Sequence, residues 1–227
     1  MDKKFKIIII IVIIAVIGII ASLSLGLFST GPTTKFNNNF MSGSIVGNAT
    51  LQPPETTSEY DKWEQSYKDN ANGIEYNMST CDNYTFLLDI MTIQNAFPKP
   101  ETRKFNGVEW KIYYSQAVPA MEINEDNQTN NSKPLDVYIL TCDYHNQSYL
   151  TVVVSNGTVE CDGSTYCKLY TDYVAPYLES VKFKHSANAP HIYDILGLSK
   201  GDYDILVKEM AEYKAGNITE QNSTQST

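Results

Sequence analysis

An uninterrupted apolar run near the N-terminus constrains this 227-residue chain more than any other feature. Residues 7–28 read IIIIIVIIAVIGIIASLSLGLF and contain no charged residue. At 1.5 Å per residue, a helix of this length spans about 33 Å, which matches the hydrocarbon core of a bilayer. A helix also satisfies its own backbone hydrogen bonds in lipid. The run therefore predicts a transmembrane helix over residues 7–28, with the lipid bilayer as its partner.

The charges on either side of this run predict its orientation. Three lysines lie within residues 1–6, whereas Lys35 is the only basic residue between the run and Glu55. Positive charge stays on the cytoplasmic side, so we expect a cytoplasmic stub over residues 1–6 and the rest of the chain outside the cell. The run is longer than the ~7–15-residue core of a cleaved signal peptide, which favours a retained signal-anchor. Cleavage near residues 21–24, where small residues gather, is the alternative.

The overall charge argues against one class of partner. The formal net charge is −9 at pH 7, and three of the 17 basic residues lie in the cytoplasmic stub. The exported part is therefore strongly acidic, which favours solubility outside the membrane. Binding to nucleic acid requires a basic surface, so we expect no nucleic-acid partner.

The chain beyond the apolar run divides into a linker, one domain and a tail. Residues 29–39 are small, polar and turn-prone, which predicts a short linker. Residues 40–215 contain no repeat and no second linker, so we expect one extracellular domain there. Residues 216–227 contain a single apolar residue, Ile218, and predict a disordered tail.

Within the domain, apolar and β-branched runs predict strands, and turn pairs mark several of their ends. The turn pairs are Asn106-Gly107, His145-Asn146 and Asn156-Gly157. The predicted strands cover residues 40–51, 73–80, 110–115, 135–144, 149–155 and 181–184. Helical spacing and caps predict helices over residues 82–96, 166–180, 190–196 and 199–213. Because strands and helices are interleaved, we expect an α+β layered domain with a mostly antiparallel sheet packed by helices.

All four cysteines follow the apolar run, and an even number outside the cell predicts disulfide bonds. Cys161 and Cys167 enclose a turn-forming loop that can bring their Cα atoms within bridging distance. The register of the predicted hairpin places Cys142 away from Cys161, which leaves Cys81–Cys142 as the second predicted bridge. The cysteines lack the short paired spacing of a zinc site, so we expect no metal there.

Sequons for N-linked glycosylation are more frequent than the composition alone predicts. There are nine, and we expect several to be occupied outside the cell, with those at turn tips the most accommodating. The acceptor residues are Asn48, Asn77, Asn83, Asn127, Asn130, Asn146, Asn156, Asn217 and Asn222.

Few residues suggest catalysis. The three histidines are His145, which stands beside Asp143, His185 and His191. No serine-nucleophile motif and no glycine-rich phosphate loop occurs, and the oxygen-rich stretch 122–128 lacks the glycine of a calcium loop. We therefore expect no catalytic residue, metal ligand or cofactor. The alternative is a cell-surface hydrolase or metal-assisted enzyme that uses these histidines.

Three stretches carry a resemblance to a known group of proteins. FMSGSIVGNATL (40–51), FNGVEWKIYY (105–114) and AGNIT (215–219), together with the apolar run, resemble uncharacterised, N-terminally anchored exported proteins of methanogenic archaea. The order of elements is also similar to the PsbP-like sandwich. The resemblance implies an anchored surface protein and no catalytic residue. The predicted function is a single-pass cell-surface glycoprotein that interacts with a protein or envelope partner.

Overall fold

The computed structural model describes residues 32–54, 61–84, 88, 98–117, 134–159, 161–186 and 188–224. Within these ranges, no helix is both long and apolar enough to span a bilayer. The predicted transmembrane helix over residues 7–28 lies outside the described residues, as does most of the predicted helix over residues 82–96.

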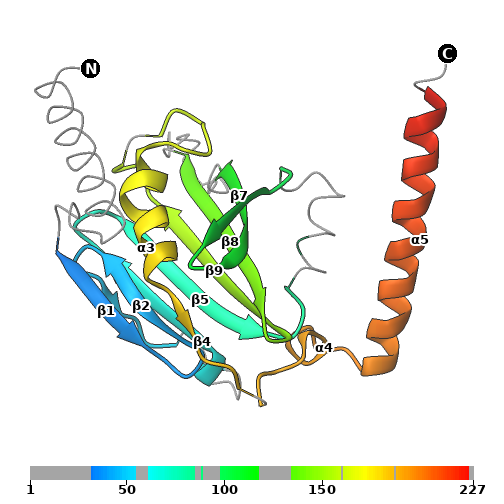
Figure 1. The fold of residues 1–227 in the computed structure, drawn as a ribbon, viewed down its shortest axis with the longest axis horizontal. Helices are drawn as coiled ribbons and strands as arrows, with labels where there is room; N and C mark the ends of the chain where they lie inside the picture. The colour runs from blue at the N-terminus through cyan, green and yellow to red at the C-terminus, as the bar shows by residue number, and fades with distance from the viewer. Residues whose placement is uncertain are drawn as a thin grey trace, which may run out of the picture.

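A seven-stranded antiparallel sheet, called the large sheet below, forms the centre of the domain (Figure 1). Its strand order is β3-β4-β5-β9-β8-β7-β6, and every neighbouring pair is antiparallel. The strands are β3 (Thr50–Leu51), β4 (Glu64–Asp69), β5 (Ile74–Cys81), β6 (Glu101–Phe105), β7 (Val108–Ala117), β8 (Leu135–Tyr144) and β9 (Gln147–Ser155). A short 3-10 turn, η1 (Asp61–Trp63), precedes β4. The predicted α+β class with a mostly antiparallel sheet is confirmed.

A second, three-stranded sheet and a helical segment cover one face of the large sheet (Figure 1). The strand order is β1-β2-β10, with β1 (Thr33–Asn37), β2 (Met41–Val46) and β10 (Lys182–Phe183). The helical segment consists of the π-helical turn η2 (Tyr170–Val174) followed by α3 (Ala175–Ser180). The Ser180 hydroxyl fixes α3 to β2, since it accepts from the Ser44 backbone N–H at 2.8 Å and donates to the Ser44 carbonyl at 3.1 Å.

Aromatic side chains fill the core between these layers. Trp110, Tyr76, Tyr138, Tyr149 and Tyr177 are all 0–1% exposed. Buried tyrosines bring a large apolar surface together with a hydroxyl that needs a partner. The Tyr177 hydroxyl, for example, lies 2.7 Å from the Thr151 hydroxyl. Most of the tyrosines in the sequence thus serve packing.

Two hairpins of the large sheet have the turn chemistry that the sequence predicts. His145 and Asn146 join β8 to β9 with φ values of 50° and 60°. Asn106 and Gly107 join β6 to β7 with φ values of 49° and 82°. Two consecutive residues with positive φ are typical of a type I′ turn, whose twist matches that of the flanking strands.

The predicted linker over residues 29–39 is wrong in its second half, because β1 occupies Thr33–Asn37. β1 is mostly polar, and only Phe36 shows that it belongs to the fold. The Phe36 side chain is 3% exposed and packs against Tyr67 and Tyr177, with ring centroids 6.1 and 5.9 Å away. A single buried residue gives no alternation of apolar and polar positions, so the sequence pattern does not predict this strand.

The predicted strand over residues 40–51 is interrupted at Gly47, and its two parts, β2 and β3, belong to different sheets. Gly47 has a φ of 106°, and a Cβ at this position would lie 1.9 Å from Oδ2 of Asp69. Only glycine can adopt this conformation at such close approach. The chain therefore crosses from the small sheet to the large one at this point.

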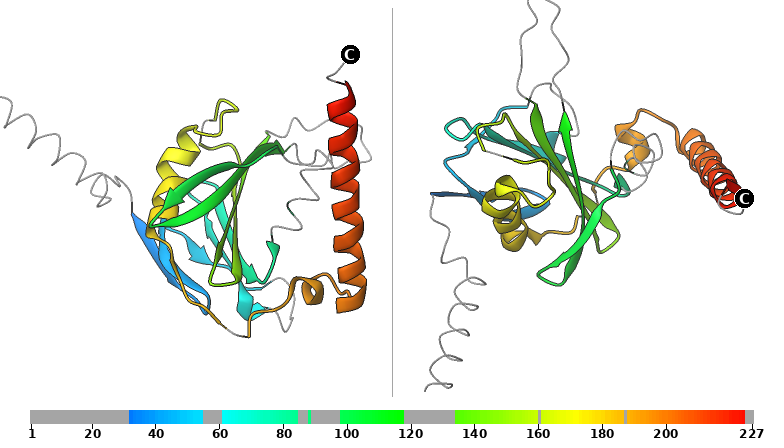
Figure 2. Two further views of the ribbon diagram at one scale, coloured as in Figure 1. Left: turned by 45° about the vertical axis from the view of Figure 1, so that its right-hand side comes forward. Right: turned by 90° about the horizontal axis from the view of Figure 1, so that it is seen from above.

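The C-terminal region consists of α4 (Ile192–Ile195) and the long helix α5 (Lys200–Thr224). Ser199 caps the N-terminus of α5, since its hydroxyl accepts from the Asp202 N–H at 3.1 Å and donates to the Asp202 carboxylate at 2.6 Å. The prediction that the chain becomes disordered at residue 216 is wrong, because α5 continues to Thr224. Continuing a helix requires only local backbone hydrogen bonds, so the end of the apolar spacing does not terminate it. Figure 2 shows α5 standing beside the sheets.

Candidate functional site

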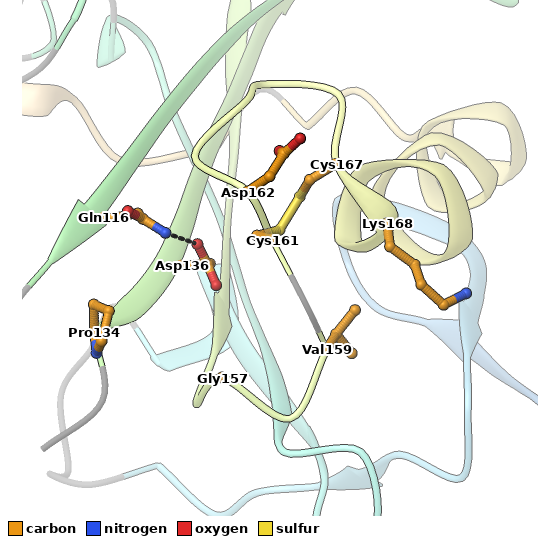
Figure 3. A pocket seen from close by; sticks show the side chains of 9 residues that line it. All are labelled: Gln116, Pro134, Asp136, Gly157, Val159, Cys161, Asp162, Cys167 and Lys168. Carbon is orange, nitrogen blue, oxygen red and sulfur yellow. Dashed lines mark hydrogen bonds between the residues drawn. A yellow bond between two sulfur atoms is a disulfide. The ribbon is translucent and has the colours of Figure 1, made fainter.

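A cavity of about 580 Å³ lies where the ends of β7 and β8 meet the loop that follows β9 (Figure 3). We call it the disulfide pocket, because the Cys161–Cys167 bridge forms part of its wall. Asp136 lies in the middle of the lining, between Gln116 on one side and the bridge on the other. The volume is within the range of cavities that hold small ligands in proteins.

Asp136 is the most deeply buried charged residue of this pocket, at 4% exposed. Its Oδ1 accepts hydrogen bonds from the Tyr114 hydroxyl at 2.7 Å and from Nε2 of Gln116 at 3.1 Å. In the β7–β8 register, Gln116 lies opposite Asp136 and Tyr114 opposite Tyr138, so these side chains share one face of the sheet. The pKa of Tyr114 is raised by burial and by its bond to the carboxylate, so its hydroxyl stays a donor.

No basic side chain forms an ion pair with Asp136 in the part of the chain that the structure describes. Lys168 also lines the pocket, but its ammonium group pairs with Asp172 one helical turn away. Buried carboxylates are normally compensated by a charge or by several donors. Asp136 has two donors on one oxygen, and its other oxygen has no hydrogen-bond partner among the described residues.

The loop between the two cysteines is fixed to the sheet. The predicted Cys161–Cys167 bridge is present, with a Cα–Cα distance of 5.1 Å. The Tyr138 hydroxyl donates to the Thr165 carbonyl at 2.8 Å and lies 3.4 Å from Sγ of Cys167. This side of the pocket is therefore held by a covalent bond and by a buried tyrosine.

Asp162 supplies a second carboxylate at the rim of the disulfide pocket. Its Oδ1 accepts from the Ser164 backbone N–H at 3.0 Å, and hydrogen bonds from Ser164 lower the pKa of this carboxyl group. Asp162 thus stays ionised in mildly acidic solution. With Asp136 below it, the pocket presents two carboxylates and the Gln116 amide, which suits a ligand that carries a cationic or strongly hydrogen-bond-donating group.

Arg103 of β6 contacts the segment that leads from the disulfide loop into η2. The guanidinium of Arg103 lies 4.0 Å from the ring centroid of Tyr166 and 5.9 Å from that of Tyr170. Its Nε also donates to the Tyr166 hydroxyl at 2.9 Å. These contacts join β6, the end of the disulfide loop and η2.

The three histidines of the sequence analysis lie on different elements. His145 occupies the β8–β9 turn, His185 follows β10, and His191 is the N-cap of α4. No hydrogen bond or ion pair joins any two of them within the described ranges. Asp143 bonds to the Ser148 hydroxyl at 2.5 Å rather than to the neighbouring His145.

Of the three histidines, only His191 has an acidic partner among the described residues. Its Nδ1 lies 2.5 Å from Oδ2 of Asp82, and Oδ1 of Asp82 accepts from the Ile192 N–H at 2.8 Å. The pair ties α4 to the end of β5. The described residues contain no cluster of three or more potential metal-ligating side chains. The oxygen-rich stretch 122–128 lies outside them.

The predicted Cys81–Cys142 bridge is wrong, because both residues are free, buried thiols. Cys81 lies opposite Ser148, whereas Cys142 lies opposite Tyr149, the next residue of the same strand. Consecutive residues of a strand point to opposite faces, so the two thiols lie on opposite faces with β9 between them. The strand order, which the sequence does not reveal, excludes the bond.

The sequons differ in their surroundings. The acceptor side chains of Asn48, Asn83, Asn146 and Asn156 are exposed, whereas Asn77 is half-buried on β5. Asn127 and Asn130 lie outside the described residues, and Asn217 and Asn222 are described only as backbone of α5.

Sequence reasoning missed Asp136, Gln116 and Asp162 as residues of one site. The only signal is an acidic residue near the start of an otherwise apolar strand, and that position alone does not identify its neighbours. No protein-family model matches the chain, and no curated protein is found to be similar to it. The resemblance to exported archaeal proteins therefore stays a prediction.

Proposed function

We propose that the chain is a single-pass, membrane-anchored domain on the outer surface of the cell that acts by binding a ligand rather than by catalysis. The apolar run over residues 7–28 would anchor it, and the Cys161–Cys167 bridge fits an oxidising exterior. The observation that carries the binding proposal is Asp136, a buried carboxylate that reaches the disulfide pocket.

The chemistry of the pocket indicates the class of ligand. Two carboxylates and a side-chain amide line it, and Lys168, the one basic residue among its described lining, pairs with Asp172 instead. A cationic group placed against Asp136 would supply the charge that the protein itself does not. We infer a ligand with an exposed ammonium or guanidinium group, such as a basic side chain of an envelope or surface protein partner.

Calorimetric titration of the detergent-solubilised full chain tests the binding site. Benzylamine serves as a cationic probe, and benzyl alcohol as a neutral probe of nearly the same shape. We expect benzylamine to bind and benzyl alcohol not to bind. Asp136→Asn should weaken benzylamine binding at least about tenfold, because a charge-assisted hydrogen bond contributes about 1.5–3 kcal/mol.

The matched control is Asp204→Asn, which removes a carboxylate from an exposed lysine pair on α5. It should bind benzylamine as the wild type does. Equal binding by the wild type and Asp136→Asn, or equal affinity for the two probes, would contradict the proposed site.

The second candidate is a cell-surface hydrolase, and the His191–Asp82 pair favours it because such a pair can orient an imidazole as a general base. On this hypothesis, His191→Ala abolishes hydrolysis of a nitrophenyl ester by the full chain, whereas His145→Ala and His185→Ala leave it intact. If the wild type and all three variants hydrolysed the ester no faster than it hydrolyses without protein, the hydrolase hypothesis would be contradicted.

A further inference from the structure

A polar groove of about 870 Å³ lies over β4 and β5, on the face of the large sheet opposite the small sheet. The cross-strand pairs Glu64–Ser79, Ser66–Asn77 and Lys68–Glu75 form its floor, because the members of each pair point to the same side. Gln52 and Pro53 of the segment after β3 also line it, as does Val152 of β9, which lies opposite Asn77 in the β5–β9 register. We call it the Asn77 groove.

Asn77 occupies the middle of this floor and is the acceptor of a sequon. The Ser66 hydroxyl donates to Oδ1 of Asn77 at 2.5 Å, which fixes the orientation of the amide. Within the described ranges, Nδ2 of Asn77 has no hydrogen-bond partner, and this is the atom to which a glycan is attached. Ser79, the hydroxyl residue of the same sequon, also lines the groove and accepts from the Tyr84 hydroxyl at 2.8 Å.

We propose that Asn77 carries an N-linked glycan and that the first sugars of this glycan lie in the groove. This inference rests on the proposed export of the domain. In the modification, Nδ2 of Asn77 bonds to the anomeric carbon of a lipid-phosphate-linked oligosaccharide. The bond from that carbon to the phosphate oxygen breaks, the lipid phosphate leaves, and the amide proton passes to a base of the transferase.

The lining of the groove suits a sugar. The amide of Gln52, the carboxylate of Glu75 and the ammonium of Lys68 can bond to hydroxyl groups, while Pro53 and Val152 can contact the C–H face of a ring. The volume is within the range that holds a ligand of drug size. The exposed acceptors Asn48 and Asn146 line none of the described cavities, so glycans there would extend into solvent.

The test uses the full chain expressed in a secretory host whose glycans begin with N-acetylglucosamine. A glycan amidase converts each occupied asparagine to aspartate, which peptide mass spectrometry measures site by site. We expect Asn77 and Asn48 both to be occupied. In the folded protein, the amidase should release the Asn77 glycan at least about tenfold more slowly than the Asn48 glycan, because release requires the sugar to leave the groove. After denaturation, the two rates should be equal.

A double variant, Lys68→Ala with Glu75→Ala, provides the matched comparison. It should keep Asn77 occupied and bring the release rate at Asn77 in the folded protein close to that at Asn48. An unchanged slow rate would overturn the inference, because protection would then not come from the groove.

The remaining outcomes separate this inference from the proposed function. Occupied Asn48 with unmodified Asn77 would overturn the inference and leave export standing. Equal release rates in the folded wild type would show that the glycan lies outside the groove, and would also overturn it. A chain with no occupied sequon would contradict the proposed export and remove the basis of the inference.

Discussion

Cys81 and Cys142 each lie inside the protein as free thiols, one on either face of the large sheet. Burial raises the pKa of the Cys81 thiol to about 12, and burial also raises the pKa of Cys142. Because only the thiolate is a good nucleophile, both thiols should be inert near neutral pH. They are packing residues rather than a redox pair.

Alkylation with iodoacetamide at pH 8 and intact mass measurement test this assignment. The native protein should gain no label, and the denatured, unreduced protein should gain one label on each of Cys81 and Cys142. Reduction before alkylation should add labels on Cys161 and Cys167. If the denatured, unreduced chain gained no label, Cys81 and Cys142 would be bonded to each other, which would contradict the structure.

The same thiols make stability depend on alkaline pH. A thiol in the unfolded chain loses its proton near pH 8.5 to 9, whereas the folded protein keeps it until about pH 12. The stabilisation is therefore complete below the unfolded pKa and is lost as the pH rises toward the folded pKa. Urea midpoints should fall steadily above about pH 9, and Cys81→Ala with Cys142→Ala should reduce the slope of that fall. If the urea midpoints of the wild type and the double variant fell with equal slopes, the loss of stability would come from the buried tyrosines, whose pKa values burial also raises.

At the scale of secondary-structure elements, the β8–β9 hairpin depends on two consecutive residues with positive φ. His145→Val should destabilise the domain by about 1–2 kcal/mol, because a β-branched residue is strained in the left-handed region. His145→Asn is the control and should be nearly neutral, since asparagine accepts this conformation. Urea denaturation of the two variants measures the difference, and equal midpoints would contradict the role of the turn.

The disulfide loop is the second element with a measurable contribution. Replacing both Cys161 and Cys167 by Ala should destabilise the domain by about 2 kcal/mol, the loop-closure entropy of so short a loop. Benzylamine binding should fall too, because the pocket wall is no longer held. Thr165→Ala keeps the bridge and serves as the control, with near-native stability. Retained stability without the bridge would show that Tyr138 and Arg103 suffice to hold the loop.

For the whole molecule, the sequence predicts the centre of the fold better than its edges. The bounds of β8 match the prediction, because a continuous apolar run bounded by turn residues is an unambiguous signal for a central strand. β1 was missed because Phe36 alone is buried in it, and the extent of α5 was missed because its last turns have no apolar spacing. The disulfide pocket was missed because it combines Gln116 and Asp136, which the β7–β8 register pairs, with Asp162 of the loop after β9, and the sequence does not show where that loop lies.

External protease on sealed cells tests the arrangement of the whole chain. We expect the domain from β1 to α5 to be digested from outside, leaving a protected fragment that contains residues 7–28. A cytoplasmic protein of the same cells provides the control and should survive until lysis. A domain that is digested only after lysis would contradict an outward-facing anchor.

The strand β1 begins at Thr33, only five residues beyond Phe28, the last residue of the apolar run. Five residues of fully extended chain reach at most about 18 Å. On the proposed arrangement, so short a connection holds the domain close to the lipid headgroups and restricts how far it can move from the membrane surface. Encounters are then confined to neighbours in the same membrane and to whatever approaches within a molecular diameter of it.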